Sequence, residues 1–199
     1  MDHIWSPYVF IENAIPSFIC DEIVNEYKEG NFQEGSLDQS EPGVAYRNRD
    51  LRKSDIIFSN QHWMNVTLYG YIIFANHDNF NYNLTDFDKE TFQFTRYLKG
   101  DYYGLHRDFC PIKDHPSYTR KLSATLQLSD SDEYEGGDLV IDMSAYDDDF
   151  TNRKKTHTMT RRKGSLIVFD SRAPHEVTPV TRGTRYSLVK WVHGDKPLR

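Results

Sequence analysis

Two residue types that bind metal ions stand one position apart in the segment His106-Arg107-Asp108. Alternate side chains of an extended strand point to the same face, so His106 and Asp108 would be presented together. His175, arriving from a distant strand, would complete a facial triad of two histidines and one carboxylate, which leaves three positions of an octahedral metal open. This donor set favours Fe(II) over a closed structural zinc site, and open positions are what oxygen chemistry requires.

Spacing alone is a weak signal, because the chain contains a second pair with the same spacing, His193-Gly194-Asp195. No histidine follows that pair, so it cannot begin an ordered triad, and we interpret it as structural or surface-exposed. The first pair also resembles the catalytic loop of protein kinases, but Lys113 stands where a magnesium-binding Asn is needed and no glycine-rich loop precedes it. The metal-site interpretation is therefore favoured over the kinase one.

Arg185 lies ten residues after His175, far enough for a turn at Pro179 and Gly183 and a return on the neighbouring strand. A guanidinium there could bind the distal carboxylate of 2-oxoglutarate through two parallel hydrogen bonds, a geometry that lysine cannot supply. Such a 2-oxo acid would occupy two of the open metal positions and O2 the third. The alternative for Arg185 is an ordinary salt bridge.

The elements that must position these residues fall into two parts. The first part predicts helices, one between Pro16 and Gly30 with Pro16-Ser17 as its cap, and one beginning near Asn60, although Gly70 weakens the second. From about Thr91 the chain instead contains short runs rich in aromatic and β-branched residues, separated by turn residues. These predicted strands cover Phe92-Leu98, Lys121-Leu128, Asp138-Met143, Gly164-Phe169 and Arg185-Val192.

This pattern predicts a mostly β fold, a double-stranded β-helix (jelly roll, cupin-like) with N-terminal supporting helices. A chain of 199 residues suits one domain, 1-199. Residues 1-90 would form the helical buttress and first strands, and residues 91-193 the jelly-roll core with the metal site. The loops from Gly30 to Ser54 and from Ser144 to Met159 could each act as a lid or form mobile surface.

Composition excludes several classes of protein. With 30 acidic and 24 basic residues the net charge is −6, which argues against a general nucleic-acid coat protein or a binder of anionic membranes. Only Cys20 and Cys110 are available for disulfides, and no apolar run approaches the length of a membrane span. We therefore expect a soluble, intracellular, cytoplasmic protein. A basic stretch from Arg153 to Lys163 is either a solvated loop or a substrate contact.

The motifs together resemble one known family. Around the ligand candidates stand, in order, Gly104-Leu105-His106-Arg107-Asp108, Glu135-Gly136-Gly137-Asp138-Leu139, Gly164-Ser165-Leu166-Ile167-Val168-Phe169, Pro174-His175-Glu176-Val177-Thr178-Pro179-Val180 and Gly183-Thr184-Arg185-Tyr186-Ser187-Leu188, followed by Trp191. Residues 92 to 193 resemble the prolyl 4-hydroxylase-type branch of the 2-oxoglutarate/Fe(II) oxygenases. The resemblance implies iron ligands and a co-substrate anchor at His106, Asp108, His175 and Arg185.

The resemblance also implies roles for tyrosines. Tyr97 matches a family tyrosine whose hydroxyl reaches the co-substrate carboxylate, with a core position as the alternative. Tyr103 is a weaker candidate near substrate or co-substrate, because its odd separation from His106 would place it on the other face of the strand. Gln127 falls near a position where some relatives have another tyrosine. Arg185, where collagen-type relatives commonly have Lys, points to the microbial or oxygen-sensing-like branches.

The activity implied by the resemblance is hydroxylation of a substrate carbon with release of succinate and CO2. The cofactor would be Fe(II), with 2-oxoglutarate and O2 as co-substrates and L-ascorbate as reductant. The expected substrate is a prolyl residue of a peptide or protein, with no membrane and no nucleic-acid partner. Two alternatives stay open: the same chemistry on a free amino acid, small metabolite or nucleic-acid base, and a non-catalytic jelly-roll binding module with a vestigial metal site.

Overall fold

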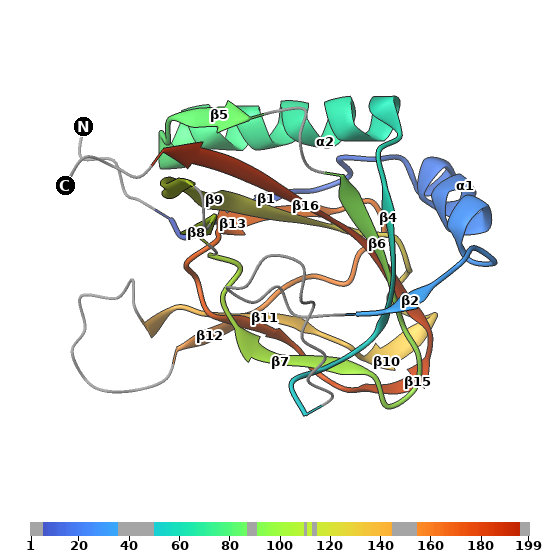
Figure 1. The fold of residues 1–199 in the computed structure, drawn as a ribbon. Coiled ribbons are helices and arrows are strands. Elements are labelled where there is room, and N and C mark those ends of the chain that lie inside the picture. The colour runs from blue at the N-terminus through green and yellow to red at the C-terminus, as the bar shows by residue number, and fades with distance from the viewer. Residues whose placement is uncertain are drawn as a thin grey trace.

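The computed structural model describes residues 6–35, 50–86, 91–109, 111–112, 115–144 and 155–195. Two antiparallel sheets face each other, and two helices cover the outer face of the larger sheet (Figure 1). The predicted mostly β jelly-roll architecture with supporting helices is confirmed. Parts of both predicted lid loops lie outside the described residues.

The larger sheet has the strand order β1-β13-β9-β16-β6-β4-β2, with β5 paired to β16 and β8 paired to β9. Its strands are β1 (Tyr8–Ile11), β13 (Leu166–Asp170), β9 (His115–Gln127), β16 (Arg185–Asp195), β6 (Phe92–Tyr97), β4 (Asp55–Ser59), β2 (Gln33–Glu34), β5 (Leu84–Asp86) and β8 (Pro111–Ile112). The smaller sheet has the order β12 (Thr156–Thr158), β11 (Leu139–Asp142), β14 (His175–Val177), β7 (Tyr102–His106) and β3 (Arg52–Lys53). A separate pair joins β10 (Tyr134–Gly136) to β15 (Val180–Gly183).

The helices are α1 (Ser17–Tyr27) and α2 (His62–Ala75), and α2 continues into a π-helical turn, η1 (Asn76–Phe80). Both predicted helices are confirmed. Pro16 takes the N-cap position of α1, within the predicted Pro16-Ser17 cap. No side chain of a described residue caps the helix, and the Pro16 carbonyl accepts hydrogen bonds from the N–H groups of Ile19 and Cys20. Among the described residues, no helix combines the length and apolar character needed to cross a membrane.

Strand β13 explains why the fold has two hydrophobic cores. Leu166 and Val168 pack in the core between the larger sheet and the helices, whereas Ile167 and Phe169 pack in the core between the two sheets. Because alternate side chains leave a strand on opposite faces, a strand covered on both sides must be apolar at every position, as β13 is until Asp170.

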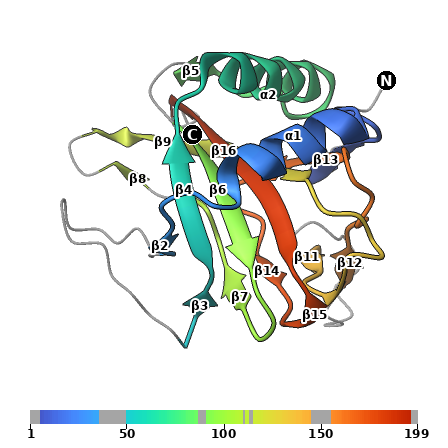
Figure 2. The same ribbon diagram turned by 90° about the vertical axis from the view of Figure 1, so that its right-hand side faces the viewer.

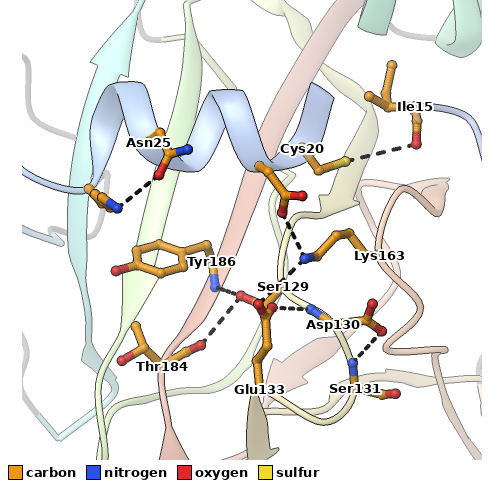
Figure 3. Close-up of polar contacts among 12 residues, drawn as sticks. Ile15, Cys20, Asn25, Ser129, Asp130, Ser131, Glu133, Lys163, Thr184 and Tyr186 are labelled. Carbon is orange, nitrogen blue, oxygen red and sulfur yellow. Dashed lines mark hydrogen bonds and ion pairs between the residues drawn. The ribbon is translucent and has the colours of Figure 1, made fainter. Parts of the chain in front are cut away.

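Ion pairs hold α1 against the rest of the molecule (Figure 3). The ammonium of Lys163 lies 2.9 Å from an Asp21 carboxylate oxygen on α1 and 3.5 Å from one of Glu133, which precedes β10. Ser129 links neighbouring strands, because its hydroxyl accepts a hydrogen bond from the Tyr186 N–H at 2.8 Å. The Ser129 contact lies at the start of β16, next to Arg185.

Candidate metal centre and anion pocket

His106 and His175 come together because their strands pair in the smaller sheet. His106 ends β7 and stands directly opposite His175, the first residue of β14. Asp108 follows two positions later, and ligand atoms of the three residues lie within 4.8 Å of one another. Within the described part of the chain, this is the one such group that could hold a metal ion. The predicted metal-binding residues therefore form a cluster.

The two imidazoles are oriented by backbone carbonyls. The Nδ1 atom of His106 lies 2.8 Å from the Gly104 carbonyl oxygen, and that of His175 lies 2.9 Å from the Ala173 carbonyl oxygen. A carbonyl can only accept, so each Nδ1 donates, and in the neutral imidazole each Nε2 keeps a lone pair that a metal ion can use. Both Nε2 atoms face Asp108, at 3.5 Å from one or other of its carboxylate oxygens.

The charges of this cluster favour an ionised carboxylate. Burial raises the pKa of Asp108, but His175 and His106 lower it by more, so that it falls well below its usual value. Burial, followed by the neighbouring His175, lowers the pKa of His106. Burial also lowers the pKa of His175, yet the Asp108 carboxylate outweighs burial and the net pKa is raised. An ionised Asp108 is the form that a metal ion requires.

Tyr103 stacks on His106, and its predicted place on the opposite strand face is wrong. The two ring centroids are 3.5 Å apart with an interplanar angle of 11°. The register between β7 and β14 shifts between His175 and Val177, because Val177 stands opposite Tyr103 although His175 stands opposite His106. This β-bulge inserts one extra residue and returns Tyr103 to the side of His106. The Arg52 guanidinium lies 4.6 Å from the Tyr103 ring centroid.

Arg185 is one of the most buried large side chains, at 1% exposure. Its Nη2 donates to Gln127 Oε1 at 2.9 Å and its Nη1 donates to Ser187 Oγ at 3.3 Å. Its Nε is buried without a hydrogen-bond partner among the described residues. A buried donor without a partner costs about 1–3 kcal/mol, so this atom is suited to an incoming acceptor.

Tyr134 presents a second buried donor beside Arg185. It is 1% exposed, and its hydroxyl has no hydrogen-bond partner within the described residues. Burial raises the pKa of Tyr134, while the adjacent Arg185 lowers it by less, so the phenol keeps its proton. Sequence reasoning missed this residue, although it stands just before the glycine pair that the resemblance singled out. We call this pair of buried donors on Arg185 and Tyr134 the candidate anion pocket.

The glycine pair allows this pocket to close. Gly136 and Gly137 have φ values of 69° and 61°, in the region that glycine adopts at little cost. A Cβ atom on Gly136 would lie 2.1 Å from the Pro179 carbonyl oxygen, and one on Gly137 would lie 3.1 Å from Arg185 Cδ. Only a backbone without side chains can therefore bring β10 against β15 and Tyr134 against Arg185.

Tyr97 lies beside Arg185 and within electrostatic range of Asp108. It stands opposite Arg185 in the pairing of β6 with β16, and the Arg185 guanidinium carbon lies 5.3 Å from its ring centroid. Burial raises the pKa of Tyr97, Arg52 and Arg185 lower it, and Asp108 raises it. Tyr97 is thus close to both the pocket and the cluster, and its hydroxyl is protonated.

The second His-x-Asp pair does not join the cluster. His193 lies in β16 opposite Arg120, and it is 5% exposed. Its interpretation as structural is consistent with this burial. Arg153 and Lys154 of the basic stretch lie outside the described residues, whereas Arg161 and Arg162 form ion pairs with Asp138 and Glu12.

Comparisons with known proteins agree with this geometry. The family model described as "2OG-Fe(II) oxygenase superfamily" matches residues 92–193. The PKHD-type hydroxylase YbiX of Escherichia coli O1:K1 / APEC is 37% identical over 102 residues, which are 50% of this chain and 41% of the relative. The chain thus matches less than half the length of this curated relative.

Solved structures share the fold. A prolyl-4-hydroxylase of Pseudomonas putida is similar with a TM-score of 0.67 at 19% identity, covering 96% of this chain and 93% of that one. A prolyl hydroxylase of Trichoplax adhaerens, in complex with a peptide fragment of the hypoxia inducible factor oxygen degradation domain, has a TM-score of 0.71 at 21% identity, covering 95% and 84%. At such identities the likeness concerns the fold.

Proposed function

We propose, from the premise that this chain belongs to the 2OG-Fe(II) oxygenase superfamily, that it hydroxylates a prolyl residue of a peptide or protein. In this proposal His106, Asp108 and His175 bind Fe(II), and Arg185 binds 2-oxoglutarate. The observation that carries it is the pair of buried, unpartnered donors on Arg185 and Tyr134 near a cluster of two histidines and one carboxylate.

The cluster fits Fe(II) by the chemistry of its donors. Ligand atoms of two histidines and one ionised carboxylate lie within 4.8 Å of one another, and this set is the one that non-haem Fe(II) oxygenases use. The carbonyls of Gly104 and Ala173 hold both imidazoles in the tautomer that a metal ion needs. Stacking of Tyr103 on His106 restrains that ring further.

The anion pocket fits the distal carboxylate of 2-oxoglutarate. One carboxylate can accept from both Arg185 Nε and Tyr134 Oη, which would satisfy the two buried donors that the protein leaves without partners. Gln127 and Ser187 accept hydrogen bonds from the remaining guanidinium nitrogens and hold the Arg185 side chain in its orientation. Tyr97, protonated and close to Arg185, is a further donor for the co-substrate.

When bound, Fe(II) with 2-oxoglutarate and O2 supplies the oxidation of the substrate carbon, with succinate and CO2 as further products and L-ascorbate as reductant. The protein supplies position and shielding. Asp108 acts as a metal ligand and not as a general base, because its pKa lies well below its usual value and a carboxylate bound to a metal ion is a poor proton acceptor. The core between the sheets, with Phe169 at 4.7 Å from the His175 ring, keeps water from one side of the centre.

The prolyl substrate is supported by the kind of proteins that share the fold, two of which are prolyl hydroxylases and one of which holds a peptide. A free amino acid, a small metabolite or a nucleic-acid base is the alternative for the same centre. The nucleic-acid alternative is weakened because Arg161, Arg162 and Lys163 already form ion pairs within the protein.

A turnover screen tests the proposal. The Fe(II)-loaded protein would be incubated with 2-oxoglutarate and ascorbate against proline-containing peptides, matched peptides with alanine for proline, free amino acids and oligonucleotides. We expect succinate formation and a mass gain of one oxygen atom on the proline-containing peptides alone. If the alanine peptides or the oligonucleotides gain oxygen equally well, the prolyl assignment is wrong while the oxygenase assignment stands.

A further inference from the structure

The outward face of α2 is apolar along its whole length. Phe74 is 63% exposed, Trp63 47%, Val66 41% and Ile73 37%. The buried face of the same helix carries Met64, Leu68, Ile72 and Ala75 instead, so α2 is apolar on both sides. A helix that is apolar all round is normally buried on all sides, yet α2 forms one outer layer of the molecule in both views (Figures 1 and 2).

The spacing of these exposed residues is that of a helix-packing seam. Trp63, Val66, Gly70 and Ile73 follow one another at steps of three, four and three residues, which is the a/d pattern of two packed helices. We propose that this face, hereafter the α2 seam, packs against the α2 seam of a second copy of the chain to form a two-fold symmetric dimer.

Gly70 lies in the middle of the seam and is not required by the fold of one chain. A Cβ atom at Gly70 would meet nothing within 4 Å, and its φ is not in the left-handed region. Glycine in a helix interior is less stable than alanine, so its presence here is unfavourable for the isolated chain. A second helix crossing at Gly70 would give the glycine a role, because a missing side chain lets two backbones approach closely.

The surface around Gly70 has the shape of a knob beside a hole. A hollow of ≈ 470 Å³ is lined by Ile11, Val66, Thr67, Gly70, Tyr71 and Phe74. The Phe74 ring stands at its margin and is largely exposed. If two antiparallel copies of α2 cross at Gly70, residues at equal distances from it face each other, so Phe74 of each copy meets Val66 of the other. The knob of one copy then enters the hollow of its mate, as an isologous interface requires.

Charge distinguishes a second copy from other occupants. No Asp, Glu, Lys or Arg occurs from Asn60 to His77, although 27% of the chain is charged. A helix that lies on an anionic membrane carries Lys or Arg beside its apolar face, and this chain has a net charge of −6. A charged partner would find no countercharge, whereas two uncharged seams bring no like charges together. The second copy is therefore the occupant that the surface favours.

The proposal does not depend on the proposed function, because α2 and the smaller sheet, whose strands carry His106 and His175, lie on opposite sides of the larger sheet (Figure 1). The core under α2 lies between the helices and the larger sheet, and the cluster borders the core between the two sheets. A dimer through α2 leaves the other face of both copies uncovered, so Fe(II) binding measures the integrity of the fold independently.

The first test measures the mass of the whole chain in solution by light scattering and sedimentation over a dilution series. We expect the wild type at twice the mass of one chain, dissociating on dilution. Phe74→Glu should be a monomer at every concentration with unchanged Fe(II) binding, since the side chain is exposed and the fold tolerates it. Phe58→Glu, an equally new charge at a 46% exposed phenylalanine on β4, should remain a dimer.

The Gly70→Ala variant tests dimerisation separately from the stability of one chain. The added methyl group meets nothing in one chain and favours the helix, so the thermal stability of the diluted monomer should rise. The same methyl group lies at the crossing point, so the dissociation constant of the dimer should increase at least about tenfold, equivalent to 1.4 kcal/mol. A stabilised monomer with an unchanged dissociation constant would show that the helices do not cross at Gly70.

Single cysteine variants test the antiparallel geometry. In the proposed dimer Gly70 faces its own symmetry mate, so Gly70→Cys should form an intermolecular disulfide under mild oxidation, whereas Phe74→Cys faces Val66 and should not. A wild type that is monomeric at all concentrations overturns the proposal. So does a dimer that survives Phe74→Glu, or a monomer that binds neutral or anionic vesicles through α2.

Discussion

Tyr134→Phe removes one hydroxyl and should have opposite effects on co-substrate binding and on stability. The hydroxyl is buried, has no partner within the described residues and lies beside Arg185. If it donates to the 2-oxoglutarate carboxylate, its loss removes a hydrogen bond to a charged group, worth about 1.5–3 kcal/mol. The dissociation constant for 2-oxoglutarate should then rise about tenfold to about a hundredfold.

Without co-substrate the same hydroxyl is an unsatisfied buried group, so its removal should stabilise the protein. We expect the free energy of unfolding to increase by about 1 kcal/mol, because the penalty for burying the hydroxyl disappears while the ring keeps its packing. Tyr27→Phe is the matched control: the Tyr27 hydroxyl is 2.9 Å from Ser59 Oγ, and Tyr27 packs in the core between the helices and the larger sheet. That variant should lose about 1 kcal/mol of stability and bind 2-oxoglutarate normally.

Calorimetric titration of 2-oxoglutarate into the anaerobic Fe(II)-loaded protein gives the dissociation constant, and urea denaturation of the protein without ligand gives the stability. A Tyr134→Phe variant that binds as tightly as the wild type would refute the assignment of Tyr134 to the pocket. A variant that loses stability would show that the hydroxyl has a partner within the protein. Each result separates the pocket from the metal site, because Fe(II) affinity should not change.

Four further outcomes follow from the geometry. His106→Ala should reduce Fe(II) binding and succinate formation to background, while His157→Ala, at an exposed histidine, should change neither; equal losses in both would end the ligand assignment. Arg185→Lys should raise the 2-oxoglutarate concentration needed for half-maximal activity about tenfold or more, because an ammonium group cannot replace the planar guanidinium. An unchanged concentration would show that Arg185 has a structural role. Tyr103→Ala should weaken Fe(II) affinity roughly 10-fold to 100-fold by releasing the His106 ring, and calorimetry that shows wild-type affinity would contradict this. Gly136→Ala should lower stability by at least roughly 1–3 kcal/mol, because φ is positive and Pro179 O would be 2.1 Å away; a normal melting temperature would contradict that reading.

Sequence reasoning succeeded where the signal is local or ordered along the chain. The resemblance to the prolyl 4-hydroxylase-type branch is confirmed by the family match over residues 92–193 and by the fold of the solved relatives. The spacing of His106 and Asp108 and the ordered motifs around His175 pointed to three residues that the structure brings together, although Asp108 lies beyond the end of β7 at His106. The convergence of all of them requires only that β7 pairs with β14.

Sequence reasoning failed where one extra residue in a pairing changes the geometry. Tyr103 was expected on the face opposite His106, because a regular strand places residues three apart on opposite sides. The β-bulge that moves Tyr103 to the side of His106 depends on how β14 pairs with β7. No sequence pattern within β7 predicts it. Tyr134 was missed for a related reason, since its place beside Arg185 arises from the pairing of β10 with β15.

The larger sheet separates two tasks in one small molecule. Its strand β13 carries Leu166 and Val168 toward the helices and Ile167 and Phe169 toward the metal-binding cluster, where Phe169 contacts the His175 ring edge-on. Strand β13 thus joins the packing under α2 to the packing around His175. The exposed apolar residues of the α2 seam belong to neither core, which is the observation behind the dimer proposed above.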